Sequence, residues 1–275
     1  MPEGAVALTI HEALVGATGL LGQAGCESPR LDAELLLADA LEVGRARLVL
    51  DANLPLDDAA AARFASLVAR RAAREPVAYI LGRKEFRYLT LAVDPRVLIP
   101  RPETELLVEV GLELPAGARV VDVGTGSGAI ALALKQERPD LLVTGTDASE
   151  DALAVARLNG ERLGLEVAFV QADLLGGVEG PFDAVLANLP YVPDGVELQP
   201  EIAGYEPASA LSAGPDGLDA FRRLLTMLDG TPLLALEVGA AQGPSVRTLL
   251  ERAGFRSVET RRDLAGYERV VVARR

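Results

Sequence analysis

Cysteine and histidine are almost absent from this sequence of 275 residues, which contains one of each. Cys26 alone cannot form a disulfide within the chain, and a single histidine leaves no Cys/His set for a zinc site. A Ser-His-Asp triad is possible only through His11. The sequence therefore predicts no metal site, and any chemistry must use carboxylates, amides, hydroxyls, the backbone or a cofactor.

Positive charge is also scarce, because 27 Lys and Arg face 40 Asp and Glu, for a net charge of −13. Nucleic-acid binding is driven by basic side chains that displace condensed counterions, so this balance argues against direct nucleic-acid binding, although a local basic patch stays open. With 49% hydrophobic and 24% charged residues, the chain lacks the composition of disorder and can bury a sizeable core. Its length corresponds to about two domains at roughly 150 residues each.

Long apolar runs are missing as well. No run approaches the ~18 apolar residues of a membrane span. The first ten residues, Met1 to Ile10, lack the positive start and apolar block of a secretory signal. We therefore expect a cytoplasmic globular protein that has no membrane partner.

The pattern of apolar residues changes twice along the chain. Residues 1–75 repeat apolar positions every three or four residues, with helix starts at Ser28-Pro29 and Asp57, which predicts a small helical domain. Residues 76–100 form the expected linker, where the alternation from Glu85 to Pro100 predicts a β-hairpin. The third segment, residues 101–275, is the expected catalytic domain.

Apolar β-like runs alternate with helical patterns through this third segment, which is typical of a parallel sheet covered by helices on both faces. Two further runs near the end predict an antiparallel edge. The predicted strands are Arg119 to Val123, Leu141 to Asp147, Val167 to Asp173, Phe182 to Asn188 and Pro232 to Val238, followed by Ser257 to Arg261 and Glu268 to Ala273.

A glycine-rich turn follows the first of these strands and precedes a helix. It reads Gly124, Thr125, Gly126, Ser127 and Gly128, and Asp147 stands at the end of the next strand, where an acid can accept ribose hydroxyls. These letters also fit a dinucleotide fingerprint, so a nicotinamide cofactor and S-adenosylmethionine both remain possible, as does a turn without a ligand. Asp122 has two interpretations, a cofactor contact or a hydrogen bond to loop amides.

A polar amide and an aromatic ring follow the fourth strand in the sequence Asn188, Leu189, Pro190 and Tyr191. An enzyme that methylates a planar amide or amino nitrogen must hold the nitrogen through acceptors on its hydrogens. The Asn188 side-chain oxygen and a backbone carbonyl of Leu189-Pro190 are suitable acceptors, and Tyr191 could pack on the flat group. The alternative is that Asn188 caps a turn and Tyr191 fills a surface hollow.

Six segments spread over the chain can be read together. They are Pro76 to Gly82, Leu98 to Glu105, Asp122 to Gly128, Asn188 to Tyr191, Glu206-Pro207 and Gly214 to Leu218. Together these segments resemble the HemK/PrmC family of peptide chain release factor N5-glutamine methyltransferases, and the resemblance covers essentially the whole chain. One difference is that Leu189 stands where the family motif Asn-Pro-Pro-Tyr has its first proline, which keeps the carbonyl but reduces rigidity.

The resemblance implies a Rossmann-like class I S-adenosyl-L-methionine-dependent methyltransferase domain with a seven-stranded, mostly parallel sheet, preceded by a helical bundle and a β-hairpin linker. It implies that Gly124 to Gly128 lie against the methionine moiety, that Asp147 accepts the ribose hydroxyls, and that Asp173 and Leu174 flank the adenine. Asn188 would touch cofactor and substrate. Asn188 to Tyr191 would hold the glutamine of the release factors' Gly-Gly-Gln motif, with Asn188, Pro190 and Tyr191 as the catalytic residues.

Several questions stay open at this point. Arg101, Glu103 and Thr104 either close over the cofactor or simply start a helix behind Pro102. The alternative functions are a ribosomal-protein glutamine methyltransferase, an adenine-amino nucleic-acid methyltransferase and a catalytically silent binding module. Class I peptide chain release factors are the expected partners, recognised by the helical domain, and we expect a monomer.

Overall fold

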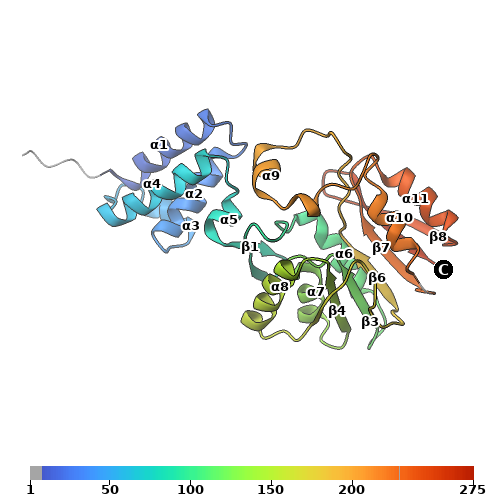
Figure 1. Ribbon diagram of the computed structural model, residues 1–275. Coiled ribbons are helices and arrows are strands. Elements are labelled where there is room, and N and C mark those ends of the chain that lie inside the picture. Colours follow the sequence, from blue (N-terminus) through green and yellow to red (C-terminus); the bar gives the residue numbers. More distant parts are fainter. Residues whose placement is uncertain (1–7, 229) are drawn as a thin grey trace, which may run out of the picture. The chain divides into compact units, whose positions relative to one another are not determined.

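The computed structural model describes residues 8–228 and 230–275, which form two compact units (Figure 1). Of the described residues, unit 1 contains 8–82 and 198–205, and unit 2 contains 83–197, 206–228 and 230–275. Residues 1–7, the start of the expected helical domain, lie outside the described residues. Within the described ranges, no helix has the length and apolar character needed to cross a membrane.

The described residues of unit 1 form helices, as predicted, with one isolated β-bridge between Thr9 and Pro55. Local capping signals explain where its helices begin: Thr9 and Glu12 form a reciprocal capping box on the first helix, and Asp57 Oδ1 accepts from the Ala60 N–H at 2.8 Å. Pro29 occupies the first turn of the second helix, although the Ser28 side chain makes no capping bond. The helices are α1 (Ile10–Gln23), α2 (Pro29–Ala40), α3 (Arg45–Leu50), α4 (Asp58–Ala72), α5 (Val77–Leu81) and α9 (Pro200–Tyr205).

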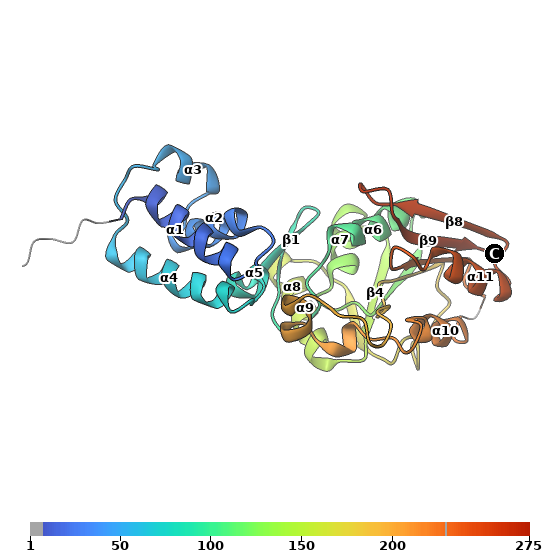
Figure 2. The ribbon, with the colours of Figure 1, turned by 90° about the horizontal axis from the view of Figure 1, so that it is seen from above.

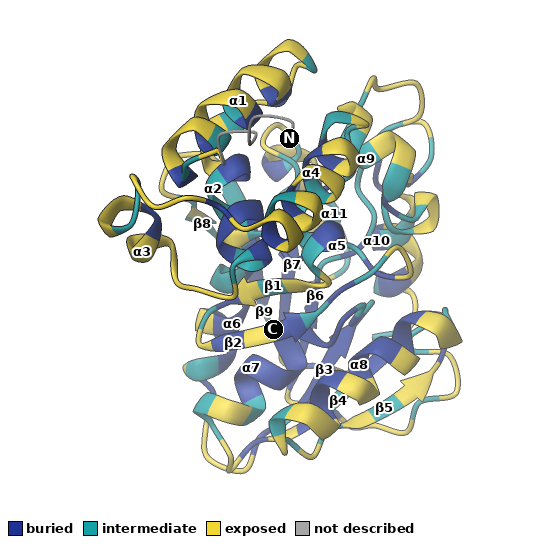
Figure 3. Ribbon diagram, turned by 90° about the vertical axis from the view of Figure 1, so that its left-hand side faces the viewer, coloured by how far each residue is buried: buried dark blue, intermediate teal, exposed yellow. Residues whose placement is uncertain are grey.

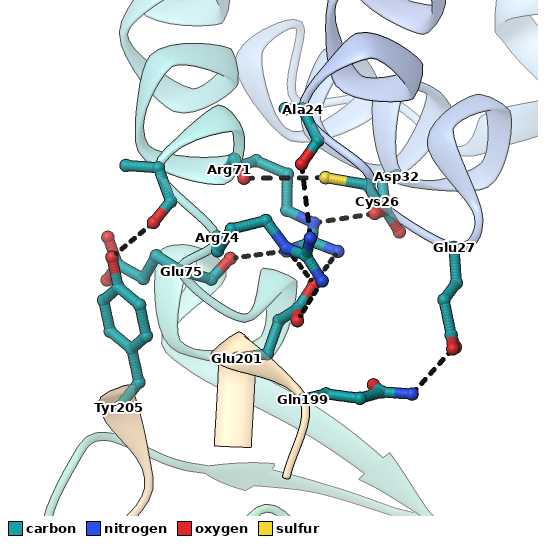
Figure 4. Close-up of polar contacts among 11 residues, drawn as sticks. Ala24, Cys26, Glu27, Asp32, Arg71, Arg74, Glu75, Gln199, Glu201 and Tyr205 are labelled. Carbon is teal, nitrogen blue, oxygen red and sulfur yellow. Dashed lines mark hydrogen bonds and ion pairs between the residues drawn. The ribbon is translucent and has the colours of Figure 1, made fainter. Parts of the chain in front are cut away.

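Helix α9 joins this unit from the far part of the sequence, where residues 101–275 were expected to form one domain. Its Glu201 is bonded to Arg71 on α4 and to Arg74, which follows the end of α4 (Figure 4). Arg74 Nη2 and Nε donate to the two Glu201 oxygens at 2.5 and 2.8 Å, and Arg71 Nη2 donates at 2.9 Å. Arg71 also pairs with Asp32 at 2.7 Å, so a largely buried ion-pair network holds α9 in unit 1.

Unit 2 combines a hairpin with a seven-stranded sheet. The hairpin of β1 (Arg83–Phe86) and β2 (Leu89–Ala92) turns at Arg87, which has a φ of 49°. The sheet has the order β5-β4-β3-β6-β7-β9-β8, in which β9 runs antiparallel to β7 and β8, while the other neighbours are parallel. Its strands are β3 (Arg119–Val123), β4 (Leu142–Asp147), β5 (Ala168–Gln171), β6 (Ala184–Ala187), β7 (Leu233–Glu237), β8 (Ser257–Arg262) and β9 (Glu268–Arg274).

Helices cover both faces of this sheet, so the central strands are buried and the edge strand β5 is largely exposed (Figure 3). Because side chains alternate along a strand, Val120 packs on one face with α6 and α7, and Val121 packs on the other with α10 and α11. The helical elements of unit 2 are η1 (Pro102–Thr104), α6 (Glu105–Leu112), α7 (Ala129–Glu137), α8 (Glu150–Leu163), η2 (Ala208–Ala210), α10 (Asp219–Leu225) and α11 (Gly243–Arg252).

The predicted fold class is confirmed. All seven predicted sheet strands are present, with ends that differ by at most two residues, and the last two form the antiparallel edge (Figure 2). From β3 the chain adds β4 and β5 on one side of the sheet and then returns to add β6 and β7 on the other side of β3, so the strand order reverses at β3. This topological switch point is where open α/β sheets bind ligands.

Candidate active site

A cavity of about 630 Å³ lies at the carboxyl ends of the parallel strands of unit 2. This volume is typical of small-molecule sites. The cavity is lined by residues that follow β3, β4, β5 and β6, which the sheet order brings together from four parts of the sequence. The lining includes Gly124 to Ser127, Asp147, Asp173, Leu174, Asn188, Leu189 and Pro190, together with Leu98, Pro100, Thr104, Pro207 and Arg223.

The glycine turn after β3 is shaped for a close ligand approach. Gly124 and Gly126 have φ angles of 74° and 54°, which L side chains rarely adopt. A Cβ on Gly126 would meet no atom within 4 Å, so its backbone faces open space. Asp147 fixes this turn, because its Oδ2 accepts the Gly126 N–H at 2.9 Å, while Oδ1 accepts the Ser149 N–H at 2.9 Å.

Asp122 lies beneath this turn and does not line the cavity formed by the described residues. Its Oδ2 accepts from the Thr125 hydroxyl at 2.6 Å and from the Ala131 N–H at 3.2 Å, which agrees with its interpretation as a loop organiser. Burial raises the pKa of Asp122 to about 7 against the lowering effect of these two hydrogen bonds. Its buried Oδ1 has no hydrogen-bond partner among the described residues.

Asp173 and Leu174 border the cavity beyond β5. Leu174 adopts a left-handed backbone with a φ of 57°, and its carbonyl accepts from the Thr146 hydroxyl at 3.0 Å. A positive φ at a leucine is unfavourable and persists only where surrounding contacts hold it. Asp173 is exposed and pairs with Arg223, which also lines the cavity.

Asn188 leaves the end of β6 and borders the cavity with its amide held at one end. Its Nδ2 donates to the Thr104 hydroxyl at 3.1 Å, and its Oδ1 accepts no hydrogen bond within the described ranges. The amide oxygen is therefore available to a ligand. Thr104 stands at the end of η1 and lines the cavity, so the segment of Arg101, Glu103 and Thr104 both starts a helix and contributes to the cavity wall.

The three residues after Asn188 are placed differently from one another. Leu189 is buried on the α10/α11 face of the sheet and lies 3.1 Å from where a Gly124 Cβ would stand, so it packs beneath the turn. Pro190 lines the cavity, but Tyr191 is not part of its lining in the described chain. The Tyr191 hydroxyl instead points to Glu237 Oε1 at 3.4 Å. Burial and the Glu237 charge raise the pKa of Tyr191 to about 12.

Two residues that sequence reasoning missed support these positions. Glu237 ends β7 and accepts the Thr104 hydroxyl at 2.6 Å. Gln242 Nε2 donates to the Tyr191 carbonyl at 2.9 Å and holds that part of the chain. An acid at the carboxyl end of a buried strand was the available signal for Glu237, but nothing in the sequence paired it with Thr104.

An ion pair joins two of the segments that carry the family resemblance. Arg101 Nη2 lies 2.5 Å from Glu206 Oε1, and Glu206 Oε2 accepts the Ile99 N–H at 3.2 Å. The Glu206 side chain is buried, and Pro100 and Pro207 beside the pair both line the cavity. Arg101 therefore stabilises one wall of the cavity.

The comparison with solved structures agrees with this architecture. A methyltransferase from Pyrococcus furiosus is 21% identical, with a TM-score of 0.51, over 67% of this chain and 87% of that chain. At this identity the likeness concerns the fold alone.

Comparisons of the amino-acid sequence identify the family as well as the fold. The family model described as PrmC N-terminal domain matches residues 12–82, and the one described as methyltransferase small domain matches residues 102–203. The release factor glutamine methyltransferase of Geobacter sulfurreducens is 40% identical over 97% of this chain and 96% of its own length. The enzyme of that name from Mycolicibacterium smegmatis is 42% identical over 97% of this chain and 98% of its own. The chain belongs to the release factor glutamine methyltransferase family.

Proposed function

We propose that this protein transfers a methyl group from S-adenosyl-L-methionine to the side-chain nitrogen (N5) of the glutamine in the Gly-Gly-Gln motif of class I peptide chain release factors. The observation that carries the proposal is the Asn188 amide oxygen, which accepts no hydrogen bond from the described residues and stands at a cavity bordered by the glycine turn. Family membership supports the choice of substrate.

The residues around the cavity fit S-adenosylmethionine. The open backbone at Gly126 gives room for the methionine moiety, and each Asp147 oxygen keeps a lone pair for a ribose hydroxyl after accepting one backbone N–H. Leu174 offers an apolar surface for the adenine, with Asp173 at its edge. When bound, this cofactor supplies an electrophilic methyl group on a sulfonium.

The protein's contribution is orientation and electrostatics. Asn188 Oδ1 and a carbonyl of Leu189 or Pro190 accept the two N–H groups of the glutamine amide and so direct its nitrogen toward the methyl group. No hydrogen bond within the described residues occupies these carbonyls. The amide nitrogen becomes acidic once it is methylated, and the proton can then leave to water. A strong base is not required, which suits a site without histidine.

The proposal includes the other expectations from the sequence. The helical unit 1 recognises the release factor, the enzyme acts as a monomer, and it works in the cytoplasm, where translation takes place. The net charge of −13 agrees with a protein substrate rather than with nucleic acid.

One experiment tests this function. The full chain is incubated with S-adenosylmethionine and a release factor, a ribosomal-protein mixture or duplex DNA, and the products are examined by mass spectrometry. We expect a one-methyl mass gain on the release factor, mapped to the motif glutamine, and none when that glutamine is replaced by alanine. Methylation confined to ribosomal proteins or to DNA, or no methylation, would refute the proposal.

A further inference from the structure

A chain of hydrogen bonds runs from the Asn188 amide into the interior of unit 2. Asn188 Nδ2 lies 3.1 Å from the Thr104 hydroxyl, which lies 2.6 Å from Glu237 Oε2. Thr104 and Glu237 are only 4% and 2% exposed. The three residues come from the end of β6, from η1 and from the end of β7, so none of them is placed by its sequence neighbours alone.

The chemistry of Thr104 and Glu237 fixes which atom donates and which accepts in each of these hydrogen bonds. An ionised carboxylate only accepts hydrogen bonds, and a hydroxyl has a single hydrogen. Thr104 must donate that hydrogen to Glu237, so toward Asn188 it can only accept. The amide must then present its NH₂ group to Thr104, which leaves Oδ1 on the cavity side.

We propose that Thr104 and Glu237 are positioning residues for methyl transfer, and that they hold the Asn188 amide with its oxygen, rather than its nitrogen, toward the substrate amide. This inference rests on the proposed function. A reversed Asn188 would present N–H donors to the N–H groups of the glutamine, and the nitrogen would no longer be held in line. The pair therefore acts on the reaction without touching the reacting atoms.

The surroundings of Glu237 make this arrangement sensitive to pH. The groups that face it are Thr104 and Glu103 on η1, Tyr191 after β6, and Arg269 on β9. The charge of Arg101 in turn lowers the pKa of Tyr191. Burial is the main cause that raises the pKa of Glu237 to about 7, and Glu103 adds to it, whereas Thr104, Arg269 and Tyr191 oppose it.

When Glu237 is protonated, the donors and acceptors of these hydrogen bonds are no longer fixed. The protonated acid can donate to Thr104, whose hydrogen is then free to point toward Asn188 and to favour the reversed amide. Turnover should therefore fall as the pH is lowered, because Glu237 becomes protonated. Glu237→Gln should lower kcat and flatten this acid limb, because the variant has no group that titrates there.

The first test compares two substitutions of Thr104 in the full chain, with release factor and S-adenosylmethionine. Thr104→Val removes the hydroxyl at nearly constant volume and should lower kcat by about 10- to 100-fold, the range expected for mispositioning at the reacting centre. Thr104→Ser restores the hydroxyl and should recover most of the activity. Cofactor Kd should change much less than kcat in both variants, since the glycine turn and Asp147 are untouched. Equal kcat values for valine and serine would overturn the inference while the proposed function stands.

A second test needs no turnover. In ¹⁵N-labelled, ligand-free protein, the Asn188 side-chain NH₂ signals are identified by their loss in Asn188→Ala. They should be protected from exchange with water in the wild type and in Thr104→Ser, and unprotected in Thr104→Val. Unprotected signals in the wild type would refute the inference, whether or not methylation is found. Absence of methylation would refute the proposed function and is a separate outcome. If Thr104→Val does not fold by circular dichroism, then Thr104→Ser and the pH profile of Glu237→Gln decide.

Discussion

The substitution Asp147→Asn tests the cofactor side of the cavity. Both carboxylate oxygens accept a backbone N–H at 2.9 Å, one from Gly126 and one from Ser149. In either orientation of an asparagine amide, one N–H donor would face an NH₂ group. The variant also loses the negative charge and one of the two acceptors that the proposed function assigns to ribose hydroxyls.

The expected magnitude follows from these contacts. A lost hydrogen bond to a charged group costs about 1.5–3 kcal/mol, so the Kd for S-adenosylmethionine should rise roughly 10- to 150-fold. The broken turn contact should also lower the free energy of unfolding by ~1–3 kcal/mol. Isothermal titration calorimetry measures the Kd, and urea denaturation measures the stability.

A matched acid-to-amide change separates this effect from a general loss of charge. Glu150 lies in the first turn of α8, close in sequence to Asp147, and its side chain is largely exposed. Glu150→Gln should leave cofactor Kd within about twofold of the wild type, because exposed ion pairs contribute little. A Kd for Asp147→Asn that is equally unchanged would refute the assignment of Asp147.

Three further outcomes are expected. Asn188→Ala should abolish most methylation of release factor while changing cofactor Kd much less, and near-normal turnover would contradict its role. Burial alone would raise the pKa of Glu201, but hydrogen bonds from Arg74, from a backbone N–H and from Arg71 together lower it to about 2. Its contribution to stability is therefore present above pH ~4.5 and is lost as the pH falls toward 2. Urea titrations should show a weaker pH dependence in that window for Glu201→Gln, and identical slopes would count against the ion pair. Gly217→Ala would bring a Cβ to 2.3 Å from the Tyr191 carbonyl oxygen at a φ of 73°, so it should destabilise the protein by about 1–3 kcal/mol, whereas Gly19→Ala in open space on α1 should not.

Local sequence patterns predicted the sheet and the glycine turn well, for reasons that are physical. Parallel strands that are buried on both faces read as continuous apolar runs, as at Ala184 to Ala187, which form β6 inside the predicted strand Phe182 to Asn188. The glycine turn was recognisable because a positive φ at Gly124 and Gly126 is strongly unfavourable for other residues. Each of these features depends on neighbours within a few positions.

The partners of the site residues were not predictable in the same way. Thr104 and Glu237 are 133 positions apart, and the strand order β3-β6-β7 is what brings η1 and the end of β7 to the same edge of the sheet. Tyr191 illustrates the same limit, because nothing in its sequence neighbours predicted that its hydroxyl would point to Glu237.

The sequence alone therefore determined the class of fold, the place of the glycine turn and the identity of the amide at Asn188, since these depend on local periodicity, backbone preference and residue chemistry. Only the tertiary structure decided how that amide is held and that α9 belongs with the helical unit through Glu201. Both depend on contacts between segments about 80 to 130 residues apart. Such contacts are settled by packing the whole chain rather than by any single segment.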